Sequence, residues 1–184
     1  MRIGIDVSQL AYDSTGVANY LSNLVFELIK NEEHEFILFF SSMRGKLQDP
    51  NSPSASLRAS KFQANSNVKI KRFKLPPTLL DLIWNKLHIL PIENFIGNVD
   101  VFITSDWTEP PSKHAKKATI IYDLIVLVNP DETDKKIVSV QKRKLKWVKK
   151  ESDMVFCISK STKSDIVKML NIDSSKVHVI YPGL

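Results

Sequence analysis

Cysteine is almost absent from this sequence, because Cys157 is the only one among 184 residues. A single cysteine excludes an intrachain disulfide, and its place in the apolar run 154–158 predicts a buried structural thiol. Long hydrophobic runs are also missing, so no segment is expected to span a membrane. Met1 and Arg2 lead straight into an apolar run instead of a signal peptide. These absences predict a cytoplasmic protein, and they leave open a peripheral position at the inner face of the membrane.

Glycine is scarce as well, with five residues in the whole chain. The pattern Gly-x-Gly-x-x-Gly is absent, and the second predicted strand ends in 39–42, Phe-Phe-Ser-Ser, without an acidic residue that could bind a ribose. These two absences exclude a dinucleotide-dependent oxidoreductase. The pattern Gly-x-x-x-x-Gly-Lys-Ser/Thr is also missing, so the usual cradle for a nucleoside triphosphate is not expected.

The histidines do not form a metal-binding pattern. They stand at positions 34, 88, 114 and 178, without the close pairing that zinc sites use. A Cys–His nucleophile is not supported either, because the cysteine lies in the middle of a predicted strand. We therefore predict no metal site and no bound cofactor.

What remains is an ordinary globular composition, with 43% hydrophobic and 25% charged residues. The length allows one domain with a sizeable core. The formal net charge of +6 favours anionic partners such as phosphates, nucleotides and acidic lipid surfaces. Nucleic acid is not favoured, since no recognition helix or base-stacking motif accompanies the charge.

Short β-branched runs alternate with amphipathic stretches, which predicts an α/β fold: one Rossmann-like, doubly wound, mostly parallel sheet over residues 1–184. The predicted strands are 3–7, 35–41, 68–73, 99–104, 118–122, 154–158 and 177–180. The predicted helices are 17–29, 79–90, 133–150 and one that ends near Leu170, with Thr162 and Asp165 spaced as a capping box. Residues 45–67, rich in Ser, Asn, Gln, Pro and Lys, predict a long polar loop.

In an open α/β sheet, ligands bind beyond the carboxyl ends of the strands, and four polar segments are predicted to meet there. They supply the candidate site residues Ser14, Thr15, Gly16, Val17, Ser105, Asp106, Trp107, Tyr122, Asp123, Ser159 and Lys160. The segment at Gly16 opens a helix, whose free N–H groups and positive dipole end can hold a phosphate or a sugar hydroxyl. Simpler explanations stay open, because Ser159 can be only a helix cap and Asp123 can bond only within its own loop.

The predicted helix after Asp131 and Glu132 is strongly basic. Its cations are Lys135, Lys136, Lys142, Arg143, Lys144, Lys146, Lys149 and Lys150. Apolar residues are interleaved with them, so this can be a solvated face over a stripe that faces the core. The alternative is attraction to an anionic bilayer or to a phosphorylated substrate.

Several of these segments together resemble the family 4 (group 1) glycosyltransferases of the GT-B fold. The resemblance lies in 2–6 with 16–21, in 84–91 with 99–102, in Ile121-Tyr-Asp-Leu-Ile125 with Asn129-Pro130, and in 153–165 with 177–183. It covers nearly the whole chain, and the order and spacing of the segments make it specific.

The resemblance implies the acceptor-side, N-terminal half of an enzyme that transfers a hexose-type sugar from a nucleotide-sugar co-substrate, without a metal, to a polysaccharide, lipid-linked or other glycan acceptor. In the family a second Rossmann-like domain binds the donor. Residues 181–184 correspond to the start of the linker into it, so we expect that half to be missing here and to come from a further domain or subunit. By resemblance, Tyr122 and Asp123 are catalytic and line the reacting centre, Gly16 faces the donor phosphates or the acceptor, and Ser105 with Asp106 lines the acceptor pocket.

Two departures from the family pattern support a competing hypothesis. The family has a histidine where this chain has Tyr122, and a tyrosine, with an ordinary pKa of about 10, is a poor proton acceptor near neutral pH. A second glycine often follows Gly16 in the family, whereas Ala18 here adds a β-carbon that is expected to hinder a phosphate or sugar. The alternative is therefore a non-catalytic binding module that kept the fold and lost the activity. On either hypothesis, the isolated chain is expected to be inactive.

Overall fold

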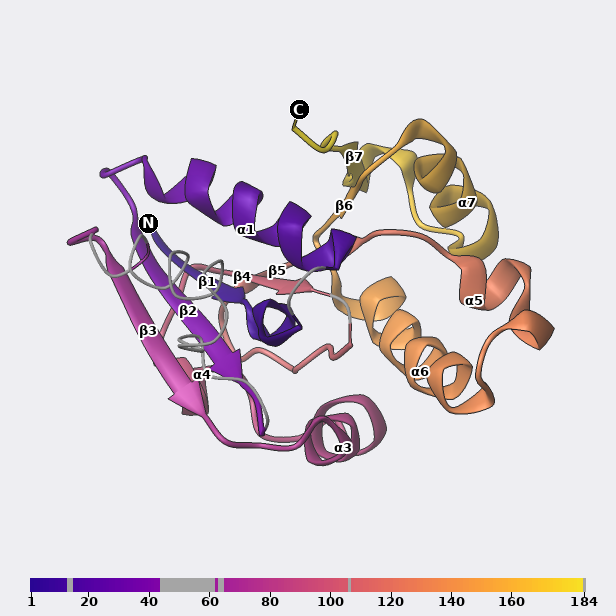
Figure 1. Ribbon diagram of the computed structural model, residues 1–184, viewed down its shortest axis with the longest axis horizontal. Coiled ribbons are helices and arrows are strands. Elements are labelled where there is room, and N and C mark those ends of the chain that lie inside the picture. Colours follow the sequence, from indigo (N-terminus) through magenta and orange to yellow (C-terminus); the bar gives the residue numbers. More distant parts are fainter. Residues whose placement is uncertain (13–14, 44–61, 63–64, 106, 184) are drawn as a thin grey trace.

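The computed structural model describes residues 1–12, 15–43, 62, 65–105 and 107–183, and within them the strands form one seven-stranded sheet (Figure 1). The strands are β1 (Arg2–Asp6), β2 (Glu35–Ser41), β3 (Val68–Phe73), β4 (Val101–Ser105), β5 (Lys116–Ile121), β6 (Met154–Cys157) and β7 (Val177–Val179). Their order is β3-β2-β1-β4-β5-β6-β7, and every neighbouring pair is parallel. The predicted doubly wound fold is confirmed, and the described sheet is parallel throughout.

Helices of very different lengths connect these strands. They are η1 (Ser8–Ala11), α1 (Gly16–Ile29), α3 (Pro77–Leu80), the π-helix η2 (Asp81–Lys86), α4 (Glu93–Ile96), α5 (Ile125–Val128), η3 (Pro130–Glu132), α6 (Lys135–Glu151), α7 (Lys160–Leu170) and η4 (Ser174–Lys176). The short helices α4 and α5 were not predicted, because four residues are too few to show a helical period.

Both faces of the sheet are buried, and β2 shows why its sequence is almost continuously apolar. Phe36 and Leu38 point into the cluster beneath α1, whereas Ile37 and Phe39 point into the cluster that α3, η2 and α4 cover. Figure 1 shows α1 and α3 on opposite sides of the sheet. A third cluster joins α6 and α7 to β5, β6 and β7, and it includes the buried Cys157, as predicted.

The predicted helix over 79–90 is wrong at its C-terminal end. The helical segment stops at Lys86, and His88 and Leu90 then take left-handed backbone angles, with φ of 53° and 58°. The buried Trp84 fixes this turn, because its indole Nε1 donates to the carbonyl of Leu90 at 3.0 Å. The apolar spacing continued past the turn, and so the sequence pattern did not reveal it.

The helix caps are side-chain oxygens that stand just before each helix. Thr15 caps α1 by accepting from the amide of Ala18 at 3.1 Å, and Ser159 caps α7 by accepting from the amide of Thr162 at 3.0 Å. The capping box predicted at Thr162 and Asp165 is therefore wrong by three positions, since α7 already begins at Lys160.

Most of the predicted loop 45–67 lies outside the described residues. Phe62, which is described, is buried and stacks on Phe26 with ring centroids 4.5 Å apart, so an aromatic anchor interrupts this polar stretch. Among the described residues, no helix is both long and apolar enough to cross a bilayer.

Candidate functional site

The strand order reverses between β1 and β4, and a crevice at the carboxyl ends of the strands is expected at such a point. Ser105 ends β4, and Tyr122 and Asp123 follow β5 directly. The hydroxyls of Ser105 and Tyr122 are hydrogen bonded at 2.9 Å, with the two residues 3% and 9% exposed. Tyr20 of α1 packs edge-on against the Tyr122 ring at 5.6 Å. The structure thus brings together predicted residues from two strand ends beside the first helix.

Ser159 reaches Tyr122 only through an intermediate residue. Its hydroxyl lies 2.9 Å from the hydroxyl of Thr162, which in turn lies 3.3 Å from the carbonyl of Tyr122. Ser159 therefore fixes the backbone behind the site while it caps α7. Lys160 is exposed in the first turn of α7 and lines none of the pockets described below.

Asp123 is exposed at the carboxyl edge, where one of its carboxylate oxygens accepts from the amide of Ile125 at 3.0 Å. This bond is the local one that the sequence left open, and it orders the start of α5. Asp123 also lines two adjoining pockets, so the local bond does not remove it from the site.

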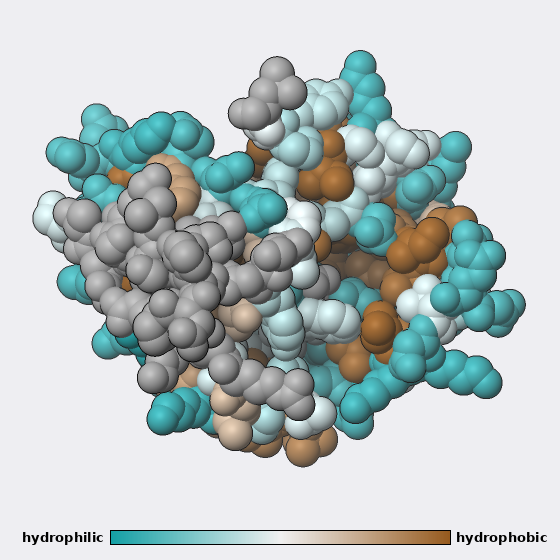
Figure 2. All heavy atoms as spheres, viewed as in Figure 1, coloured by the Kyte–Doolittle hydropathy of each residue, from teal (hydrophilic) through white to brown (hydrophobic). Residues whose placement is uncertain are grey.

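The first pocket, of about 160 Å³, lies between α1, the end of β5 and α6. Val17, Trp107, Tyr122 and Asp123 line it together with Lys144 and other residues of α6. Figure 2 shows a hollow in this part of the molecule with hydrophobic side chains in its walls. Four of the predicted site residues therefore meet at one cavity.

Two larger openings adjoin the first pocket. The second pocket, of about 670 Å³, lies between α1 and the last described residues and shares Val17, Tyr122 and Asp123 with the first. Gly16 and Tyr181 also line it. A groove of about 510 Å³ runs between the α3–η2 segment and α6, and Trp107 contacts both this groove and the first pocket.

The start of α1 differs from what the sequence suggested. Ala18 is fully buried in the core, so the prediction that its β-carbon hinders a ligand is wrong. A β-carbon placed on Gly16 would instead meet no atom within 4 Å, so the open side of the helix terminus is at Gly16. The hydroxyl of Thr15 is used as the cap, and Ser14 and Asp106 lie outside the described residues.

Sequence reasoning missed three residues of this region: Tyr20, Gln141 and Lys144. Lys144 was placed on the basic face of its helix, but it is 2% exposed and lines the first pocket with Gln141. A signal was present, because positions 141, 144, 145 and 148 follow the helical period of the inward face. Tyr20 lines the second pocket and donates its hydroxyl to the carbonyl of Ile180 at 3.0 Å.

Burial shifts the pKa values of two groups near the site. It raises the pKa of the Tyr20 hydroxyl, and the Cys157 thiol adds to that shift. Burial likewise raises the pKa of Cys157, against the opposing effects of the Ser159 backbone and of Lys163. At neutral pH these groups therefore remain protonated and act as packing and hydrogen-bonding groups rather than as bases.

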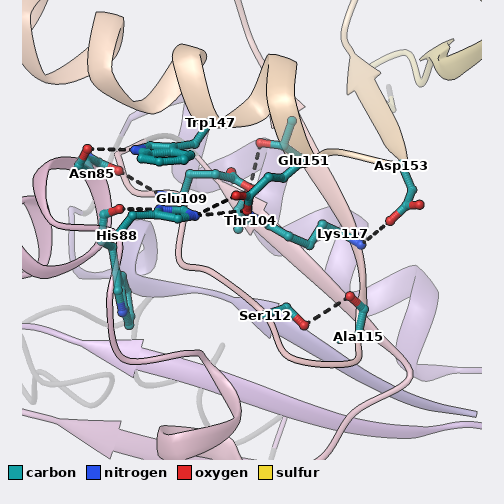
Figure 3. A network of polar contacts seen from close by, with 12 residues as sticks. Asn85, His88, Thr104, Glu109, Ser112, Ala115, Lys117, Trp147, Glu151 and Asp153 are labelled. Atoms are coloured by element: carbon teal, nitrogen blue, oxygen red, sulfur yellow. Dashed lines mark hydrogen bonds and ion pairs between the residues drawn. The ribbon is translucent and has the colours of Figure 1, made fainter.

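A buried polar network supports the end of β4 from behind (Figure 3). The carboxylate of Glu109, which is fully buried, accepts from the hydroxyl of Thr104 at 2.6 Å and lies 3.0 Å from the ammonium of Lys117. Lys117 also pairs with Glu151 of α6 at 3.0 Å. Thr104 directly precedes Ser105, so this network fixes the strand that carries the site.

The same network joins α6 to the turn after η2. His88 lies 2.9 Å from the Glu151 carboxylate, and its ring stacks on Trp147 at 3.5 Å, as Figure 3 shows. Burial by itself raises the pKa of Glu151, but the hydrogen bonds and charges of Lys117 and His88 outweigh it and hold that pKa below its ordinary value.

Comparison with known proteins identifies the family to which this chain belongs. Residues 14–184 match the family model described as Glycosyltransferase Family 4. The chain belongs to glycosyltransferase family 4. The resemblance seen in the sequence is therefore confirmed, and the pockets at the carboxyl edge are those of a family 4 domain.

One solved structure is similar to this family 4 chain. The crystal structure of a glycosyltransferase from Rickettsia africae ESF-5 is similar over 100% of the chain, at 15% sequence identity and a TM-score of 0.49. The chain covers 43% of that protein. None of the curated proteins compared with the chain matches it.

Proposed function

We propose that this chain is the acceptor-binding half of a nucleotide-sugar-dependent glycosyltransferase, which needs a donor-binding half on another domain or subunit. The observation that carries the proposal is the convergence of Val17, Trp107, Tyr122 and Asp123 on one pocket at the carboxyl edge of a family 4 domain. The reaction is the transfer of a hexose-type sugar to a hydroxyl of a polysaccharide, lipid-linked or other glycan acceptor.

The start of α1 is the proposed contact for the donor phosphates. The helix terminus presents backbone N–H groups and a positive dipole end, and Gly16 leaves space for a phosphate to approach. Val17 lines both pockets, so a donor at this terminus would lie beside Tyr122 and Asp123. Tyr181, which lines the second pocket, is the proposed start of the linker towards the donor-binding half.

Asp123 and Trp107 are the proposed contacts for the acceptor. Sugar transfer removes a proton from the attacking hydroxyl, and a carboxylate at the pocket can accept a hydrogen bond from that group. The indole of Trp107, half-buried between the first pocket and the groove, offers a flat apolar surface on which a sugar ring can stack. An acceptor longer than one sugar would extend from Trp107 into the groove.

The acceptor contacts can be tested by binding alone. We expect Trp107→Ala to abolish the recognition of any oligosaccharide that the chain binds on a glycan microarray. Lys160→Ala is the matched control, because Lys160 was also a predicted site residue but lines none of these pockets. Equal loss in both variants would contradict the placement of the acceptor at Trp107.

One observation favours the second candidate, a non-catalytic binding module. The hydroxyl of Tyr122, which stands where the family has a histidine, is hydrogen bonded to the buried Ser105. In this arrangement the hydroxyl is engaged by a buried side chain, and a tyrosine offers a poor base for an acceptor hydroxyl. A module of this kind would still bind a glycan through Trp107 and Asp123.

Restoring the histidine distinguishes the two candidates. Tyr122→His is measured with a donor-binding half present, by the release of nucleoside diphosphate from a nucleotide-sugar. An increase in transfer supports the enzyme, whereas no increase favours the module. Tyr122→Phe is the control, because it removes the hydroxyl that is bonded to Ser105 without adding an imidazole, and it is not expected to increase transfer.

A further inference from the structure

The segment from α3 to the turn after η2 exposes an unusual number of large aliphatic side chains. Leu79, Leu82, Leu87, Ile89 and Leu90 are between 38 and 55% exposed, all within twelve residues. We call these five residues the apolar stripe. Single exposed leucines are normal on a soluble protein, but a cluster of this size marks an interaction surface.

A rigid backbone presents the apolar stripe. The amide of Ile89 donates to the carbonyl of Ile83 at 2.8 Å, and Nδ1 of His88 lies 2.7 Å from the carbonyl of Trp84. Trp84, which is fully buried, also holds the carbonyl of Leu90. His88 and Leu90 have positive φ angles, which non-glycine residues adopt rarely. The fold therefore holds these aliphatic side chains outward.

A basic face of α6 lies directly beside the apolar stripe. Its cations are Lys135, Lys142, Lys146, Lys149 and Lys150, which are exposed and form no ion pair with any residue that the structure describes. We call these five residues the lysine face. The ammonium groups of Lys146 and Lys150 lie 5.2 and 4.8 Å from the ring centre of Trp147. The Trp147 ring stacks on His88, which stands between Leu87 and Ile89 of the stripe in the sequence.

Two carboxylates beside this surface are already paired with other cations. Asp81 pairs with Arg143 at 2.7 Å, and Glu151 pairs with Lys117 and His88. The surface therefore combines outward aliphatic side chains with exposed ammonium groups that form no ion pair with the described residues.

We propose that the apolar stripe and the lysine face together dock the protein on an anionic lipid bilayer. Aliphatic side chains enter the interfacial region of a bilayer, while lysines next to them reach the lipid phosphates. Charge complementarity selects this occupant over a neutral apolar partner, since the stripe is bordered by cations that only an anionic surface would neutralise. The stripe begins next to Pro77 and Thr78, which line the groove, so docking brings the groove to the membrane.

Binding to vesicles tests this surface without a donor or an acceptor, so its outcome does not depend on the proposed glycosyl transfer. The chain is sedimented with vesicles of phosphatidylcholine alone or with an equal amount of phosphatidylglycerol. We expect binding only to the anionic vesicles, and weaker binding as salt increases. Equal binding to both vesicle types, or to neither, overturns the proposal.

Two sets of variants separate the apolar and the charged contributions. The combination of Leu87→Gln, Ile89→Ser and Leu90→Asn is expected to weaken binding roughly tenfold or more, and asparagine suits the left-handed backbone at position 90. Lys146→Gln and Lys149→Gln are each expected to weaken it about fivefold. Met169→Gln, which changes an exposed apolar residue of α7, is the matched control and should leave binding unchanged. Thermal unfolding of each variant shows that it is folded.

A fluorescent label tests whether the apolar stripe enters the bilayer. Cys157 is buried, so an environment-sensitive dye attached to Ile89→Cys or Met169→Cys reports mainly on the new cysteine. A blue shift with anionic vesicles at position 89 but not at position 169 supports insertion of the stripe. If the lysine variants lose binding while the aliphatic variant and the dye at position 89 do not respond, the surface binds soluble polyanions, and the proposal is wrong.

Discussion

Lys117 carries a charge into the interior beside β4, where its ammonium group lies between Glu109 and Glu151. Its side chain is 5% exposed and that of Glu109 is fully buried, so the two charges depend on each other for solvation. The pair holds Thr104, and through it the strand that ends at Ser105, in one position.

We expect Lys117→Met to destabilise the protein by about 3–5 kcal/mol, because the Glu109 carboxylate is left buried without its counter-charge. Urea unfolding measures this change. Combining it with Glu109→Gln removes the uncompensated charge and should recover a large part of the loss. A change below about 1 kcal/mol in the single variant would mean that water reaches the pair.

Glu151 makes the free energy of unfolding depend on pH in the acidic range. Its pKa in the folded state is held below the ordinary value of 4.5, so its ion pairs stabilise the fold above that pH. The contribution is lost as the pH falls through the depressed pKa. In Glu151→Gln the pairs are absent at all pH values, so the stability gap to the wild type should narrow below about pH 4.5. Urea midpoints from neutral pH to about pH 3 measure the gap, and a constant gap would contradict the assignment.

At the scale of the elements, Gly4 and Gly16 differ in the space around them. A β-carbon on Gly4 of β1 would come within 2.7 Å of side-chain atoms of both Ile96 and Phe102, so the strand packs there against α4 and β4 without space. Gly16 at the start of α1 has no atom within 4 Å of that position.

Gly4→Ala is therefore expected to cost about 1–3 kcal/mol through overpacking. Gly16→Ala should be neutral or stabilising by up to about 1 kcal/mol, because alanine restricts the unfolded chain and favours the helix. Denaturant unfolding of the two variants side by side provides the comparison. Equal losses would show that Gly16 packs more tightly than the structure indicates.

Elements also differ in how well the sequence predicts them. The bounds of β2 and β3 agree with those predicted, because a run of apolar or alternating residues between polar turns is a local signal. The turn after η2 was not predictable, since it depends on the buried Trp84, which binds a carbonyl six residues further along the chain.

At the scale of the whole molecule, the three hydrophobic clusters share one sheet. Adjacent residues of β5 point to opposite faces, so that Ile120 belongs to the cluster beneath α1 and Ile121 to the cluster of α6 and α7. Loss of β5 would open both clusters at once.

We therefore expect the chain to unfold in a single cooperative transition, with the same midpoint by tryptophan fluorescence and by far-UV circular dichroism. Two resolved transitions would show that the part from β6 to β7 unfolds separately. Ile121→Ala tests the coupling: if the transition is single, the variant lowers both midpoints together.

Much of the candidate site followed from the sequence, because the carboxyl ends of parallel strands lie at one edge. Ser105, Tyr122 and Asp123 were placed there from the strand pattern, and they do meet. Lys160 was assigned to the same edge by the same rule, but a residue in the first turn of α7 lies away from the pockets. Lys144 was assigned to solvent because its type suggested exposure, although its helical position placed it inside.

The sequence by itself determined the family, the α/β class and the approximate positions of the strands, because these depend on residue types and on spacings of a few positions. Only the tertiary structure decided that the Tyr122 hydroxyl binds Ser105, that Glu109 and Lys117 form a buried pair, and that the stripe from Leu79 to Leu90 faces outward beside α6. Such contacts depend on where a side chain points once distant segments pack together. Packing and the need to pair buried polar groups fix that direction, and the order of residues along the chain does not show it.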